Sequence, residues 1–201
     1  RLEVGKVIVD YESAAFSVKG LVEFKSGDEV YGSGFRGDVK FEMLEIFAFD
    51  AVGVFGKKDD YRYFLTDVFY ETSPERGIVL APVPISFYGF GGGLYRKMQQ
   101  TSSLASSSNF GKSLSGINYK PDRSVGMGFM TSTKFGMLAV PSAFNAKVSF
   151  EIQFNQDGGM NFVQLRGDAA FMDSPAKWGK MSESIKSAVG KLESAGGELN
   201  P

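Results

Sequence analysis

Hydrophobic and polar residues alternate along most of the first 170 residues, which is the pattern of half-buried β-strands. Val148, Phe150, Ile152 and Phe154 are each separated by one polar residue. After them comes the segment 155–159, Asn-Gln-Asp-Gly-Gly, and alternation then resumes. Asp-Gly between two alternating runs is a strong signal of a β-hairpin. The pattern therefore predicts an antiparallel pair of strands on either side of 155–159.

A second hairpin is predicted around the acidic turn 56–60, between alternating runs at 47–55 and 61–69. The apolar run 79–85 is different because it contains Pro82 and Pro84. Proline cannot donate a hydrogen bond to a neighbouring strand, so this run is expected to be an edge strand or an extended connection.

The period of the pattern changes only near the C-terminus. Ser174 and Pro175 suit the start of a helix. One apolar stripe then recurs at spacings of three and four residues, and Gly196-Gly197 follows it: Trp178, Met181, Ile185, Val189 and Leu192. We expect an amphipathic helix over 175–194 that docks on the sheet. The Ser-rich segment 101–116 is expected to be a mobile loop or linker.

An internal repeat appears when the chain is aligned with itself at an offset of 94 residues. Between 32–44 and 126–138, seven of thirteen positions are identical. The residues that define the repeat are Gly32, Gly34, Phe35, Gly126, Gly128 and Phe129. The expected fold is a single mainly β domain over 1–201, with antiparallel sheets forming a sandwich or an open groove or barrel. Two duplicated β units of about 95 residues, at about 20–100 and 116–173, and the C-terminal helix would build it.

Composition removes much of the usual chemistry of enzymes. The chain has no Cys and no His, which excludes a Ser-His-Asp triad, a Cys-His pair and disulfides. Its net charge of −1 gives no basic excess for nucleic acid, and no apolar run is long enough for a transmembrane helix. We expect no enzyme activity, no catalytic residue, no cofactor and no metal site. The chain begins at Arg1 without Met, as expected for a piece of a longer protein.

Four motifs resemble sites but lack what each site requires. Segment 106–113 ends like a phosphate-binding loop without its first glycine, and 89–94 has Leu where a dinucleotide-binding turn has its last glycine. The Arg-Gly-Asp tripeptides at 36–38 and 166–168 run directly into predicted strands. The acidic turns contain no calcium-binding loop. Aromatic residues beside 89–94 are the possible binding or structural positions: Phe87, Tyr88, Phe90 and Tyr95.

The Gly-x-Gly-Phe strands, the segment Phe-Tyr-Gly-Phe-Gly-Gly-Gly-Leu-Tyr at 87–95, and the absence of Cys and His resemble modules of very large, repetitive, β-rich exported bacterial surface proteins. The resemblance implies an exported, non-enzymatic structural or binding module that mediates assembly or adhesion. Its partners would be neighbouring modules. One alternative is a β-groove or barrel that binds or conducts a lipid-like ligand, with aromatic residues facing lipid. Another is a carbohydrate-binding domain whose aromatic rings stack on sugars.

Overall fold

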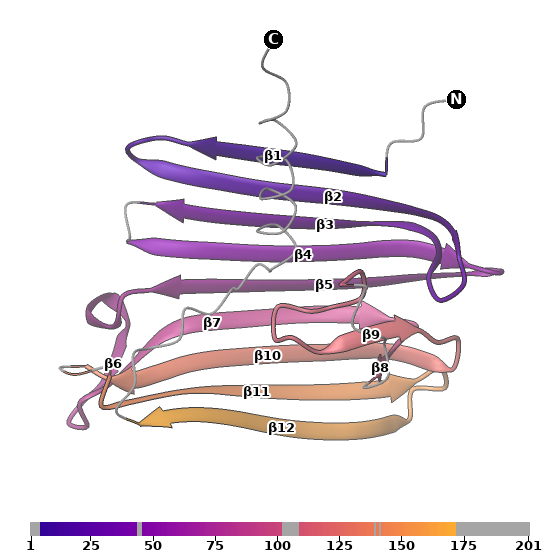
Figure 1. Ribbon diagram of the computed structural model, residues 1–201. Coiled ribbons are helices and arrows are strands. Elements are labelled where there is room, and N and C mark those ends of the chain that lie inside the picture. The colour runs from indigo at the N-terminus through magenta and orange to yellow at the C-terminus, as the bar shows by residue number, and fades with distance from the viewer. Residues whose placement is uncertain (1–4, 44–45, 102–108, 139, 141, 172–201) are drawn as a thin grey trace, which may run out of the picture.

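The computed structural model describes residues 5–43, 46–101, 109–138, 140 and 142–171, and nearly all of them belong to antiparallel β-structure (Figure 1). The strands are β1 (Lys6–Glu12), β2 (Phe16–Asp28), β3 (Gly32–Met43), β4 (Phe47–Lys58), β5 (Tyr61–Thr72), β6 (Ile78–Leu80), β7 (Ile85–Arg96), β8 (Met98–Thr101), β9 (Asn118–Pro121), β10 (Val125–Met137), β11 (Phe144–Asn155) and β12 (Met160–Phe171). A short 3₁₀ helix, η1 (Pro74–Arg76), precedes β6. The expectation of a mainly β fold is confirmed.

The large sheet has the order β1-β2-β3-β4-β5-β7-β10-β11-β12, and β6 pairs with the start of β7. Strands that follow one another in this order are antiparallel neighbours, as the stacked arrows of Figure 1 show. Within the described residues β1 and β12 are the two edges and do not pair, so the sheet is open. Of the forms that the sequence left open, the structure therefore has an open sheet and not a closed barrel.

Both predicted hairpins are present. β4 and β5 join through a turn at Asp59 and Asp60, where Asp59 has a φ of 53°. β11 and β12 join at 156–159, where Gly158 has a φ of 83°, a conformation that glycine adopts without steric cost. The proline-containing run also behaves as predicted, because among the described strands β6 pairs with β7 alone and lies at an edge.

Side chains of successive residues point to opposite faces of a strand, and the two faces of this sheet differ sharply. One face, which we call the polar face, holds the apolar core together with most of the buried charged residues. The other, which we call the aromatic face, carries most of the exposed Phe, Val and Leu residues.

The apolar core lies on the polar face, beneath the connection that carries β8 and β9 from β7 to β10. Residues of β4, β5 and β7 pack there against this connection. The buried members of the cluster are Tyr31, Val52, Val54, Tyr63, Leu65, Tyr95, Met98, Phe110, Tyr119 and Val125. In Figure 1 this connection lies in front of β7 and β10.

Part of the segment expected to be a mobile linker belongs to this core. Phe110 has no exposed surface, and Ser113 is buried. Residues 109–116 thus form a loop, as predicted, but apolar burial and backbone hydrogen bonds pack part of it into the core. Residues 102–108 lie outside the described part of the chain.

The two halves proposed as a repeat have partly similar strands. β3, β4 and β5 form a meander, and so do β10, β11 and β12. Upstream the halves differ: residues 22–25 lie in β2 of the large sheet, whereas 118–121 form β9 of a separate two-stranded sheet. Duplication of the unit stays a prediction.

The C-terminal helix expected at 175–194 falls on residues outside the described part of the chain. Among the helices of the described residues, none has the length and apolar character needed to cross a membrane.

Gly128 is required by a close approach of the Tyr95 ring. A Cβ atom added at Gly128 would lie 2.0 Å from that ring, whereas a Cβ at Gly37 would meet nothing within 4 Å. We expect Gly128→Ala to lower the free energy of unfolding by about 2 kcal/mol or more, as overpacking does. Gly37→Ala, in a strand of similar length, should be neutral or slightly stabilising. Equal unfolding midpoints for the two variants in urea would contradict this placement of Tyr95.

Candidate functional site

The aromatic face is the most unusual surface of the molecule, because large apolar side chains on it remain exposed across every strand of the sheet from β1 to β12. Single exposed hydrophobic residues are normal, but a contiguous patch of this extent marks an interaction surface. Its exposed members include Val7, Val9, Tyr11, Phe16, Phe24, Phe35, Val39, Phe49, Phe55, Val68, Tyr70, Phe90, Leu94, Phe129, Phe150, Val163, Leu165 and Phe171.

A row of phenylalanines crosses this face near the β2–β3 and β4–β5 hairpins. Phe24, Phe35, Phe55 and Phe64 are successive register partners on β2, β3, β4 and β5. Their ring centroids are 6.3, 5.3 and 6.2 Å apart in that order. We call these four residues the first aromatic row. The side-by-side rings follow directly from the strand register.

A second aromatic row crosses the opposite end of the same face, in two stretches. The first stretch is Tyr11, Phe16, Phe41, Phe47 and Tyr70, with centroid separations between 5.5 and 5.8 Å. The second is Phe87, Phe135, Phe144 and Phe171, with separations of 5.2, 6.1 and 5.1 Å.

The surface between the two rows carries uncharged side chains, many of them small. Phe47 and Phe55 lie eight residues apart on β4, which is about 26 Å along the strand. On β2 to β5, all described, the positions between the rows on this face carry Val, Gly, Ala, Thr and aromatic residues without a charge. Beyond the first row the same face carries basic residues, since Lys57 pairs in register with Arg62.

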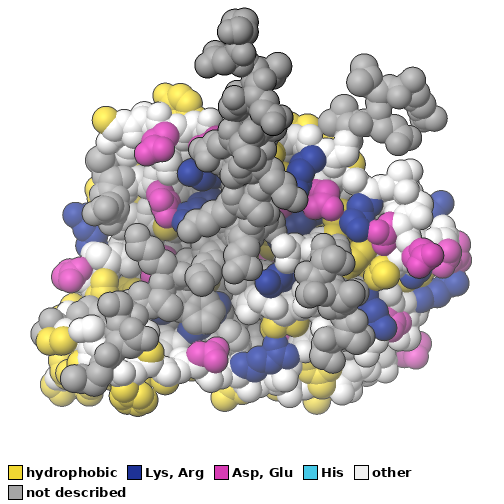
Figure 2. Space-filling model, in the orientation of Figure 1, with side chains coloured by type: hydrophobic (Ala, Val, Ile, Leu, Met, Phe, Trp, Pro, Cys, Tyr) yellow, Lys and Arg dark blue, Asp and Glu magenta, His cyan; other side chains and the backbone are white. Residues whose placement is uncertain are grey.

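The polar face presents the opposite chemistry. Lys, Arg, Asp and Glu side chains are spread over the face on which β8 and β9 lie (Figure 2). Several of them are nearly inaccessible to solvent: Arg36, Asp38, Asp50, Asp67, Lys134, Lys147 and Glu151. Buried charges of this kind are stable only when they are paired or hydrogen-bonded.

Arg36 anchors the connection between β7 and β10 to this face. Its guanidinium donates to both carboxylate oxygens of Asp38, at 2.6 and 2.5 Å. Its Nη1 also donates to the backbone carbonyls of Asn109, Phe110 and Lys112, at 2.7 to 3.0 Å. The bidentate pair fixes the guanidinium, so one side chain satisfies three carbonyls of the connection.

Asp67 holds the same connection from β5. Its Oδ2 accepts a hydrogen bond from the backbone N–H of Leu114 at 2.9 Å. Nearby, the Tyr95 hydroxyl donates to Oε1 of Glu151 at 2.7 Å, and Gln153 donates to the Tyr95 hydroxyl at 3.1 Å. The polar face is thus a connected hydrogen-bond network beneath and beside the connection.

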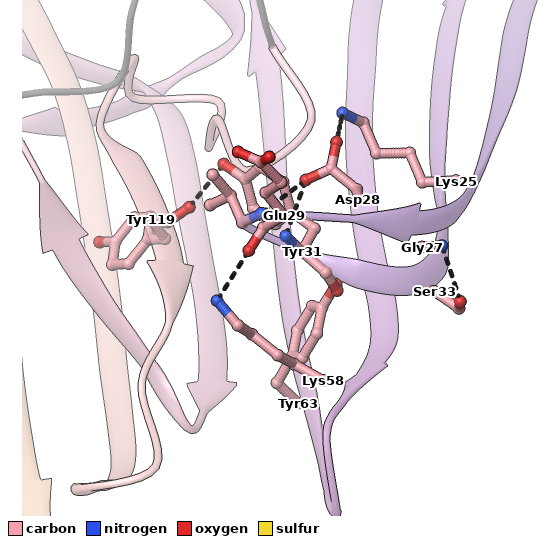
Figure 3. Close-up of polar contacts among 10 residues, drawn as sticks. Lys25, Gly27, Asp28, Glu29, Tyr31, Ser33, Lys58, Tyr63 and Tyr119 are labelled. Carbon is pink, nitrogen blue, oxygen red and sulfur yellow. Dashed lines mark hydrogen bonds and ion pairs between the residues drawn. The ribbon is translucent and has the colours of Figure 1, made fainter.

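The β2–β3 hairpin closes over the edge of the core (Figure 3). Oδ1 of Asp28 accepts from the backbone N–H groups of Val30 and Tyr31, both at 2.9 Å, and Oδ2 accepts from Lys25 at 2.6 Å. The Tyr31 hydroxyl donates to the carbonyl of Tyr119 at 3.0 Å. Tyr63 in turn donates to the carbonyl of Tyr31 at 2.7 Å. The hairpin therefore joins β2, β5 and β9.

Burial raises the pKa of Tyr31 to about 12. At Asp28 partial burial alone would raise the pKa, but the bonds from Lys25 and from the backbone of Tyr31 and Val30 outweigh it and hold the pKa below its ordinary value.

The aromatic residues expected to bind or support a ligand are divided between the two faces. Phe87 and Phe90 lie on the aromatic face, whereas Tyr88 and Tyr95 are buried on the polar face. A bulge causes this division: Gly89 and Phe87 pair with consecutive residues of β10, so Tyr88 is an extra residue in β7. The structure therefore does not bring the four rings together.

The repeat-defining residues occupy matching positions at the starts of β3 and β10. Phe35 and Phe129 lie on the aromatic face with 42% and 45% exposure. The four glycines allow close backbone or ring approaches, because a Cβ at Gly32, Gly34 or Gly126 would fall within 2.4 Å of a neighbouring carbonyl oxygen.

Sequence reasoning missed the anchoring role of Arg36, Asp38 and Asp67. The Arg-Gly-Asp motif at 36–38 lies inside β3, and its Arg and Asp pair with each other on the polar face. The copy at 166–168 lies in β12. The available signal was the charged residue repeated every second position, which marks a polar sheet face. Within the described residues no three potential metal ligands converge.

The chain matches no protein-family model, no curated protein and no solved structure.

Asp28 provides a test of the hairpin. We expect Asp28→Ala to lower the free energy of unfolding by about 1 to 2 kcal/mol, as the loss of a side-chain cap does. Asp28→Asn should cost less, because its Oδ1 can still accept from Val30 and Tyr31.

The pH dependence of stability separates the contribution of the Asp28 charge from that of its capping hydrogen bonds. The pKa of Asp28 is lower in the folded protein than in the unfolded chain, where it is near 3.9. Its carboxylate therefore contributes to the free energy of unfolding above that unfolded pKa, and the contribution is lost as pH falls through the lower folded pKa. Urea unfolding of wild type should show this loss below about pH 4. In Asp28→Asn the loss should be smaller, and identical acid slopes would contradict the depressed pKa.

Proposed function

We propose that this chain is a non-enzymatic structural β module of an exported protein and that its aromatic face contacts the acyl chains of a lipid bilayer. The observation that carries the proposal is the arrangement of that face. Two rows of aromatic residues, six to eight residues or about 20 to 26 Å apart along the strands, border an uncharged apolar band on β2 to β5.

The dimensions of this band approach those of a lipid-facing sheet. Strands that cross a membrane tilt by about 40°, which reduces the spacing of about 20 to 26 Å between the rows to a height of about 15 to 20 Å. The apolar band of lipid-facing sheets is about 25 Å tall and is bordered by aromatic residues at both interfaces. Twelve-residue strands such as β4 and β5 supply enough length for the band and both borders.

The charges flanking the band support the same proposal. Lys57 and Arg62 lie on the aromatic face just beyond the first aromatic row, where a lipid headgroup phosphate would meet them. The polar face carries the buried charged network and would face water, as the interior of a lipid-facing sheet does.

The carbohydrate-binding alternative has less support. Sugar rings stack on open aromatic faces, but here neighbouring rings stack on one another. The rings of Phe35 and Phe55 lie 5.3 Å apart with 25° between their planes, and those of Phe16 and Phe41 lie 5.8 Å apart with 25°.

Two arginine substitutions on β3 test the lipid contact. Val39 is 44% exposed and pairs with Ala51, which lies midway between Phe47 and Phe55 on β4, and Ser33 lies on the same face beside Lys57, beyond the first row. We expect Val39→Arg to reduce flotation of the full chain with phosphatidylcholine vesicles at least about 30-fold, since a charge at the bilayer midplane costs about 2 to 4 kcal/mol. Ser33→Arg should have little effect.

Both positions are exposed on the same strand, so an aqueous surface would tolerate the two arginines equally well. Flotation of Val39→Arg at the wild-type level, or equal losses in the two variants, would overturn the proposal. Far-ultraviolet circular dichroism of both variants provides the check that the strands are retained.

A further inference from the structure

The outer edge of β12 is an exposed strand whose sequence is complementary to itself in the antiparallel sense. Within the described residues β12 pairs only with β11, so the backbone groups on its other side have no neighbouring strand. Such an edge is a template for pairing with another strand. We propose that β12 is the interface at which two copies of this chain join their sheets.

The direction of the strands decides what can pair with this edge. The path from β1 to β12 contains nine strands that alternate in direction, so β1 and β12 run the same way (Figure 1). Pairing of β12 with β1 would therefore be parallel, unlike every other pair in the sheet. A two-fold axis instead places β12 antiparallel to the partner's β12 and preserves the alternation.

Charge complementarity fixes the register of this pair. With the axis at Gly167, Arg166 lies opposite the partner's Asp168, and Asp168 lies opposite the partner's Arg166. Arg166 already donates to Gln100 and Gln164 through Nη2, both at 2.6 Å, which leaves its other donors for a carboxylate. Asp168 is exposed. Two opposite-charge cross-strand pairs thus form on the polar face.

The aromatic face continues across the same junction. This register pairs Leu165 with the partner's Ala169 and Val163 with the partner's Phe171, all on the aromatic face. Leu165 and Phe171 are 72% and 70% exposed, among the most exposed apolar side chains of the molecule. At the axis two glycines meet, and a Cβ at Gly167 has no neighbour closer than 4.0 Å within its own chain.

β1 shows the same self-complementarity at the other edge of the sheet. With an axis at Val9, Lys6 lies opposite the partner's Glu12 over the seven residues of the strand. Two copies joined at both edges would form a closed antiparallel sheet of eighteen strands. Closure would give hydrogen-bond partners to the backbone groups that an open edge exposes, and a sheet in lipid requires such partners.

Cysteine cross-linking tests the register, because the chain contains no Cys. In the proposed pair the two copies of residue 167 have Cα atoms about 5 Å apart, within the range of a disulfide. Gly167→Cys should form a disulfide-linked dimer on mild oxidation. Leu165→Cys alone should not, since its two copies lie about 13 Å apart. A mixture of Leu165→Cys and Ala169→Cys should form the mixed dimer.

A charge exchange tests the partner. Arg166→Asp and Asp168→Arg each place like charges opposite one another in a homodimer, and we expect each to weaken self-association about tenfold or more. Mixed together, the two variants place opposite charges at both positions and should recover wild-type association. A misfolded variant would not regain association on mixing, so the mixing experiment distinguishes loss of the interface from loss of the fold.

The measurements are made on the full chain in detergent, by size-exclusion chromatography with light scattering. Monomeric wild type, or equal cross-linking of Gly167→Cys and Leu165→Cys, would overturn the interface. The inference does not require the lipid contact, which vesicle flotation measures separately. Dimers that do not float with vesicles would contradict the lipid contact alone, and monomers that float would contradict the β12 interface alone.

Discussion

Antiparallel hydrogen bonding across the sheet is the constraint on which the rest of this structure depends. Register pairing places every second side chain on one face, so the same strands build two surfaces of opposite chemistry. Phe35 and Arg36 are neighbours in the chain, but one lies in an exposed aromatic row and the other is buried among carbonyls and a carboxylate. A slip of one residue would exchange these environments and bury charges without partners.

The polar face is stabilised by contacts between distant parts of the chain. Arg36, Tyr31 and Asp67 reach the connection between β7 and β10 from three different strands or turns. Their targets are mostly backbone groups, so the connection is fixed by its main chain together with a few buried rings such as Phe110 and Tyr119. The Ser-rich composition of this region is compatible with such fixing, because the bonds do not depend on its side chains.

The sequence predicted features that depend on residues close together in the chain, but not features that depend on contacts between distant segments. Asp157-Gly158 and the acidic turn at 59–60 predicted two hairpins, because turn residues and alternation act over a few positions. Alternation also separated Phe35 from Arg36, but it could not show which face is covered. Burial of Phe110 depends on residues such as Tyr31, whose ring lies against it although it is far away in the chain. The bulge at Tyr88 was equally invisible, since one extra residue on one strand has no local signal.

The basic residues beside the first aromatic row make the two ends of the aromatic face unequal. Lys57 and Arg62 lie at the hairpin end, whereas the strand ends beyond the other row carry residues such as Met43 and Thr72 on this face. In the proposed contact with a membrane whose leaflets differ in anionic lipid, this asymmetry would orient the sheet. Each basic residue near an anionic surface contributes about 1 kcal/mol, so one orientation of the sheet is favoured over its reverse. Under the proposed function, the sheet would therefore have a preferred direction across the bilayer.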